Sequence, residues 1–85
     1  MKIELVKTCN ACPEQYNAWV DDQQVGYLRL RHSYFSVRYP DAYGDNIYEA
    51  NPEGDGIFHP HEREYYLDEA KKAIIKHMKK IGVIK

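Results

Sequence analysis

The sequence predicts an α+β fold, in which an antiparallel β-meander of four to five strands carries one C-terminal amphipathic helix on one face. Two observations predict it. Residues 2–50 contain short aromatic and β-branched segments separated by polar turns, and from residue 60 the apolar residues recur at helical spacing. The length of 85 residues fits one domain. We therefore expect a single domain over residues 1–85, with strands within 2–50, a loop at 51–59 and a helix at about 60–81.

The expected strands follow one another in the first part of the chain. Each is rich in β-branched or aromatic residues and is bounded by polar turns. Their ranges are 2–8, 15–20, 25–31, 34–39 and 46–50. The connectors 21–24 and 32–33 are short enough for hairpins, so the second, third and fourth strands are expected to be neighbours in the sheet. The places of the first and fifth strands stay open.

Alternation within the third and fourth strands gives the sheet two different faces. One face is apolar and carries Leu28, Leu30, Phe35 and Val37. The opposite face is polar and carries Tyr27, Arg29, Arg31, Tyr34, Ser36 and Arg38. We expect the helix to cover the apolar face and to leave the other one open.

The helix is predicted from a stripe of residues at spacings of three and four. The stripe consists of Tyr66, Ala70, Ala73, Ile74, His77, Met78 and Ile81. Pro60 suits the first turn, the last turn is rich in lysine, and Gly82 suits the end. These signals predict where the helix begins and ends.

The formal net charge of −1 gives the whole molecule no attraction to nucleic acid or to anionic membranes, so any such binding needs a local patch. No apolar run approaches the roughly 18 residues of a membrane span, and the N-terminal segment lacks the apolar region of a signal peptide. We expect a cytoplasmic protein without a membrane partner. Its two cysteines should then be reduced.

The segment 51–62, NPEGDGIFHPHE, has the ligand spacing of an EF-hand calcium loop. Asn51, Glu53, Asp55 and Glu62 would supply the side-chain oxygens, and Gly56 would allow the sharp turn. A strand, not a helix, is expected before the loop, and prolines interrupt it. The alternative is a Gly-Asp-Gly turn whose Glu62 complements the positive end of the helix.

Zinc is the other metal that the sequence offers. Cys9 and Cys12 are two residues apart and could bind one ion together with His59 and His61. The alternative is a pair of small buried thiols beside a turn and a pair of solvated histidines at the start of the helix.

The polar sheet face suggests a nucleic-acid site. Arginines can meet phosphates while tyrosines stack on bases. The candidate residues are Tyr27, Arg29, Arg31, Tyr34 and Arg38. The alternative is a solvated face whose arginines pair with neighbouring acids.

An acidic, tyrosine-rich surface is the fourth candidate site, since residues 41–69 contain many carboxylates and a single arginine. Tyrosine supplies interface area and carboxylates steer toward basic partners. The candidate residues are Tyr39, Asp41, Tyr43, Asp45, Tyr48, Glu49 and Tyr65. The alternative is an ordinary polar surface. No nucleophile, base and donor set typical of catalysis occurs, so we expect no enzyme.

Two segments prompt comparison with known families. Residues 24–37, QVGYLRLRHSYFSV, resemble the central hairpin of GNAT-type N-acetyltransferases, but the acetyl-CoA turn of that family is missing, so no active-site residue carries over. The segments CPEQY, VGYLRLRH and NPEGDGIF, followed by EREYYL, resemble small uncharacterised proteins of phages and prophages. This resemblance implies a compact accessory or anti-host-defence inhibitor that acts by binding.

From the sequence we therefore expect a non-enzymatic module that binds a basic protein partner through its acidic, tyrosine-rich surface. The alternatives are a nucleic-acid-binding domain that uses the arginine and tyrosine face, and a small domain organised by calcium or zinc. The partner, the oligomeric state and the biological role stay open.

Overall fold

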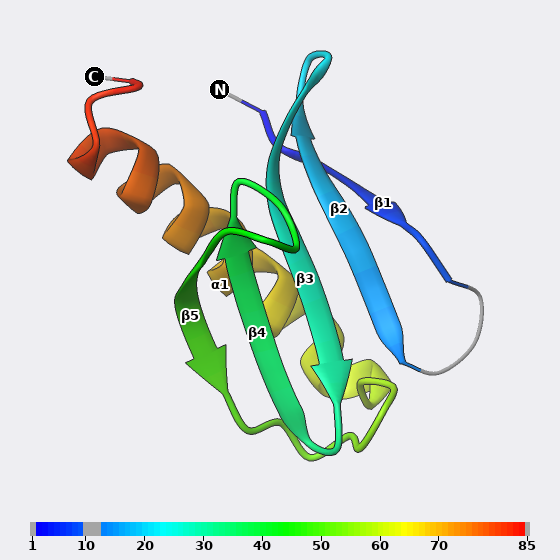
Figure 1. Cartoon of the computed structure of the whole chain (residues 1–85). Helices are drawn as coiled ribbons and strands as arrows, with labels where there is room; N and C mark the ends of the chain where they lie inside the picture. Colours follow the sequence, from blue (N-terminus) through cyan, green and yellow to red (C-terminus); the bar gives the residue numbers. More distant parts are fainter. Residues whose placement is uncertain (1, 10–12, 85) are drawn as a thin grey trace.

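The computed structural model describes residues 2–9 and 13–84 and contains one five-stranded antiparallel sheet and one helix (Figure 1). The strands are β1 (Glu4–Lys7), β2 (Glu14–Val20), β3 (Gln23–Arg31), β4 (Tyr34–Tyr39) and β5 (Asp45–Ala50), and the helix is α1 (Pro60–Lys80). The strands lie in sequence order. The predicted α+β meander with a C-terminal helix is confirmed, and β1 and β5 are the edges of the sheet.

Two tight turns join the central strands. Asp21 and Asp22 connect β2 to β3, and His32 and Ser33 connect β3 to β4. Both residues of the second turn have positive φ, 53° and 58°, which matches the twist of a two-residue hairpin. The expected hairpins are confirmed, although β3 begins at Gln23, earlier than alternation indicated. A bulge between Ala18 and Trp19 shifts the register and lets the pairing continue to Val20 and Gln23.

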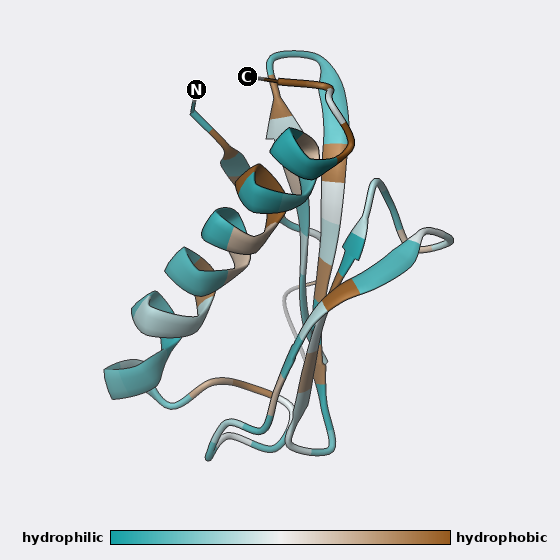
Figure 2. Ribbon diagram, turned by 90° about the vertical axis from the view of Figure 1, so that its left-hand side faces the viewer, coloured by the Kyte–Doolittle hydropathy of each residue, from teal (hydrophilic) through white to brown (hydrophobic). Residues whose placement is uncertain are grey.

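α1 lies against one face of the sheet, as Figure 2 shows, and contacts β3, β4 and β5. The buried core between these layers contains Ile3, Tyr16, Ala18, Val25, Leu28, Leu30, Phe35, Val37, Phe58, Ala70, Ile74 and Met78. The helix comes close to the sheet at Gly26, where an added Cβ would lie 2.6 Å from Cδ1 of Ile74. A glycine at this point therefore lets the two layers approach.

The helix stripe is confirmed at Ala70, Ile74 and Met78, which are buried, but the prediction for Ile81 was wrong. Ile81 is 49% exposed because the helix ends at Lys80 and Gly82 turns the chain with a φ of 81°. This turn brings Ile84 back against the core in its place. Within residues 2–9 and 13–84, no helix is long and apolar enough to cross a membrane.

Candidate functional site

The sheet face opposite α1 carries a groove of about 380 Å³. We call it the arginine groove, and it is lined by Tyr27, Arg29, Arg31, His32, Tyr34, Ser36, Arg38 and Ala42. All five residues that the sequence assigns to the arginine and tyrosine face contribute to this one depression.

Strand register explains why these side chains meet. In the β3–β4 pair, Tyr27 lies opposite Arg38 and Arg31 lies opposite Tyr34. Directly opposed residues of antiparallel strands point to the same side of the sheet with their Cβ atoms about 5 Å apart. Each pairing therefore sets an arginine beside a tyrosine on the groove face.

The arginines of the groove form no ion pair with a described carboxylate. Within the described part of the chain, the ion pairs join His61 to Glu53, Arg63 to Glu14 and Lys72 to Glu69, and none includes an arginine of the groove. The alternative, in which these arginines pair with neighbouring acids, therefore does not match the structure. Positive charges that gather without forming an ion pair favour an anionic ligand.

Arg29 and Arg38 make different hydrogen bonds. The Nε atom of Arg29 is buried and has no hydrogen-bond partner among the residues that the structure describes. Arg38 donates from Nη1 to the carbonyl oxygen of Ala42 at 3.1 Å. A buried donor without a partner costs free energy.

The two tyrosines of the groove are held by their hydroxyl groups. Tyr27 donates to the side-chain oxygen of Gln15, and the hydroxyl of Tyr34 accepts a hydrogen bond of 3.0 Å from Asn46. Tyr34 is 40% exposed. The rings therefore have fixed positions, and an exposed aromatic face is a platform for a planar group.

Three lining residues were not among the predicted site residues. Ser36 lies on the predicted polar face, so alternation could have included it. His32 follows Arg31 at the tight turn, and its position there is visible in the sequence. Ala42 comes from the connection between β4 and β5, and no sequence signal indicates that this connection reaches the groove.

The acidic, tyrosine-rich residues do not share one face. Tyr39 and Tyr48 are half-buried on the helix side. The ring centroid of Tyr39 lies 4.8 Å from that of His77, and the ring centroid of Tyr48 lies 6.1 Å from that of Phe35. Burial raises the pKa of Tyr48. Asp45 borders a second cavity between β5 and α1.

The remaining members of that set lie elsewhere. Tyr43 is 96% exposed on the connection between β4 and β5, and Asp41 accepts the backbone N–H of Tyr43 at 3.0 Å. Glu49 lies opposite Ser36, on the groove side of β5, and Tyr65 is exposed on α1. Binding of a basic protein through these residues stays a prediction.

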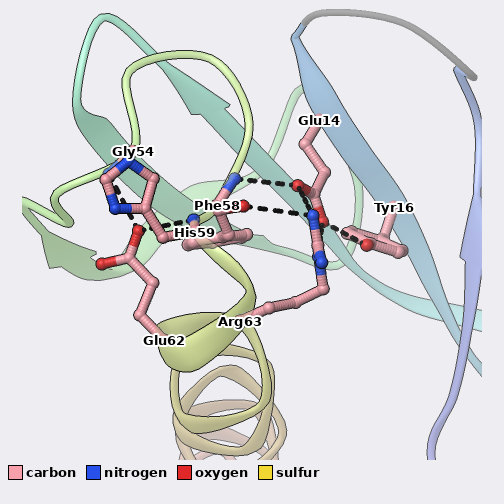
Figure 3. Close-up of polar contacts among 7 residues, drawn as sticks. All are labelled: Glu14, Tyr16, Gly54, Phe58, His59, Glu62 and Arg63. Atoms are coloured by element: carbon pink, nitrogen blue, oxygen red, sulfur yellow. Dashed lines mark hydrogen bonds and ion pairs between the residues drawn. The ribbon is translucent and has the colours of Figure 1, made fainter.

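Glu62 points inward and holds the loop before α1 (Figure 3). Its carboxylate accepts the backbone N–H groups of Glu53, Gly54 and His59 at 2.9, 2.8 and 3.0 Å. Burial alone would raise the pKa of Glu62, but these three donors, His59 foremost, hold the pKa below its ordinary value. The oxygens that the calcium hypothesis requires from Glu62 therefore bind the backbone instead.

The other calcium candidates are also dispersed. The side-chain amide of Asn51 donates to the carbonyl oxygen of Ser33 at 3.2 Å, and the carboxylates of Asp55 and Glu62 do not gather with that of Glu53. Of the zinc candidates, His59 and His61 lie together with Glu53. Cys9 is not part of that cluster, and Cys12 lies outside the described residues.

A second buried carboxylate, that of Glu14, is absent from every predicted site. It accepts hydrogen bonds from the Tyr16 hydroxyl, the backbone N–H of Phe58 at 3.0 Å and Nε of Arg63 at 2.9 Å (Figure 3). Burial alone would raise the pKa of Glu14, but the hydrogen bonds from these donors have the larger effect. The pKa of Glu14 therefore lies below its ordinary value. Burial also raises the pKa of Tyr16, to about 12. The network is internal and joins β2 to α1.

Comparisons of the chain with protein-family models, with curated proteins and with solved structures find no match.

Proposed function

We propose that this chain is a non-enzymatic binding module that holds single-stranded nucleic acid in the arginine groove. The observation that carries the proposal is the convergence of Arg29, Arg31 and Arg38 on one groove without an ion pair to any described carboxylate. Guanidinium groups bind phosphate oxygens through several donors at once, which suits a site of this kind.

The tyrosines favour a single strand over a duplex. Tyr27 and Tyr34 lie among the arginines, with their hydroxyls held by neighbouring strands. Aromatic rings stack on unpaired bases with little preference for sequence, and they cannot reach bases inside a duplex. The expected ligand is therefore an unpaired segment whose backbone meets the arginines and whose bases meet the rings.

The acidic, tyrosine-rich set supports a basic protein partner less strongly. Its members are divided between the helix side, the β4–β5 connection and the groove side of β5. The arginine groove brings all its predicted members to one place, so we place the function there.

The test measures the binding of labelled oligothymidine and oligouridine by fluorescence anisotropy. A duplex of equal length serves as the competitor. Replacing Arg29, Arg31 and Arg38 together with alanine should weaken single-strand binding by about tenfold or more. The logarithm of the wild-type affinity should fall with the logarithm of salt concentration at a slope of about −2, because roughly three phosphates are contacted.

The matched control replaces Lys72, Lys76 and Lys80 with alanine. These lysines are exposed on α1, away from the groove, and their loss removes the same amount of positive charge. Affinity should stay close to the wild type. An equal loss in both triple variants would mean that only net charge matters, and a wild-type chain that binds no oligonucleotide would remove the proposal.

A further inference from the structure

Two histidines and a glutamate meet on the exposed side of the segment that leads into α1. Their potential ligand atoms, in Glu53, His59 and His61, all lie within 4.8 Å of one another. Oε2 of Glu53 and Nε2 of His61 are 2.8 Å apart, and the rings of His59 and His61 have centroids 5.6 Å apart. We propose that these three residues form a binding site for a divalent transition-metal ion such as zinc.

The donor types select this class of metal. Two imidazole nitrogens and one carboxylate oxygen suit zinc, nickel, cobalt or copper, whereas calcium and magnesium take oxygen ligands almost exclusively. Zinc bonds of about 2 Å in a tetrahedral arrangement set ligand atoms roughly 3.3 Å apart. All three side chains are exposed, so small rotations can draw them together. The ion would replace the hydrogen bond between Glu53 and His61.

The backbone that carries the ligands is fixed in advance. The buried carboxylate of Glu62 binds the N–H groups of both Glu53 and His59, which ties the two ends of the loop to each other. Pro60 lies between the two histidines and restricts the backbone there. Little conformational entropy then remains to be lost when the metal binds.

Charge also favours a cation at this place. The N-terminus of a helix is positive and would repel a metal ion. The carboxylate of Glu53 lies beside His61 and that of Glu62 binds the N–H of His59, so both lie at this end of α1 and offset that charge. Three protein ligands leave room for water or for an outside group in the metal's coordination shell.

The test uses tag-free chain in which Cys9 and Cys12 are both replaced by serine, so that thiols cannot compete for the metal. Calorimetry should show one saturable zinc site per chain, and cobalt should give the visible absorption of a tetrahedral complex. H59A, H61A and E53Q should each weaken binding by about tenfold or more.

Two control variants match the ligands in type. H32A removes an exposed histidine of another loop, and D55N neutralises an exposed carboxylate close to Glu53 in sequence. Both should bind zinc as the parent does. Thermal unfolding without metal should show that every variant is folded.

Three results would overturn the proposal. The first is the absence of saturable zinc binding in the serine background. If the unsubstituted chain then binds zinc, the metal belongs to the cysteines. The second is zinc binding that survives H61A and E53Q. The third is calcium binding tighter than zinc binding, which would contradict the predicted class of metal.

Discussion

At the scale of single residues, Glu14 shows how a polar group stabilises this small core. Its side chain is fully buried, while its partner Arg63 is partly exposed. A buried carboxylate is tolerated only when donors satisfy it, and here a hydroxyl, a backbone amide and a guanidinium group do so. Removing Arg63 should therefore cost more than the loss of a surface ion pair.

The lowered pKa of Glu14 predicts a loss of stability in acid. The unfolded chain takes up a proton near the ordinary value of 4.5, while the folded chain does so only at lower pH. The stabilisation is therefore complete above about pH 4.5 and disappears as the pH falls through the folded pKa. Urea unfolding from neutral to acid pH should show a falling free energy of unfolding, and Glu14→Gln should flatten that slope.

The control for this prediction is Glu64→Gln, which removes an exposed carboxylate from the same end of α1. It should leave the slope as in the wild type. A wild-type slope that survives Glu14→Gln in full would assign the acid sensitivity to another group, of which Glu62 is the first candidate.

The residues of the arginine groove could be predicted from the sequence because side chains alternate between the two faces of a strand. The two strands that carry most of them also follow each other directly in the sequence. Arg29 and Arg38 were placed on one face by alternation and a short turn. The role of Glu14 could not be predicted in this way, since Arg63 lies 49 residues further along the chain. The meeting of Glu53 with His59 and His61 likewise depends on how Glu62 folds the loop.

At the scale of elements, the segment 51–59 is a structural part of the fold. The N–H of Glu14 donates to the carbonyl of Gly56 at 2.8 Å, and the N–H of Ser33 donates to that of Asp55 at 2.7 Å. Phe58 is buried and packs on Phe35 and Tyr66. The loop is thus hydrogen-bonded both to the start of β2 and to the turn beside the arginine groove.

Two glycines allow a comparison between this loop and the sheet. At Gly54 an added Cβ would lie 2.1 Å from the carbonyl oxygen of Ile57, which is backbone and cannot move alone. At Gly26 it would meet the end of the Ile74 side chain, which can rotate. Gly54→Ala should lower the free energy of unfolding by about 2 kcal/mol or more, and Gly26→Ala by clearly less. Denaturant unfolding measures both.

This ordering would be contradicted if Gly26→Ala lowered the free energy of unfolding as much as Gly54→Ala or more. Such a result would mean that the Ile74 side chain has no alternative position.

The end of the helix shows where prediction from spacing stops. Helical spacing correctly placed Ala70 and Ile74 on the core, since spacing governs a regular helix. It failed at Ile81, because the positive φ of Gly82 redirects the chain at the point where regular spacing ends.

At the scale of the whole molecule, the meander predicts a gradient of local stability. β3 is paired on both sides and its apolar residues lie under α1, whereas β1 is a short edge strand with mostly exposed residues. Amide hydrogen exchange should be slowest in β3 and β4 and much faster in β1. Equal protection of β1 and β3 would show instead that the sheet opens only as one unit.

The position of Glu14 has a consequence for the chain as it is synthesised. The ribosome releases Glu14 before Phe58 and Arg63, which follow it by 44 and 49 residues. Until they emerge, the Glu14 carboxylate lacks two of its donors, and its burial without them would cost free energy. We therefore expect the core around Glu14 to close only after the start of α1 has been synthesised.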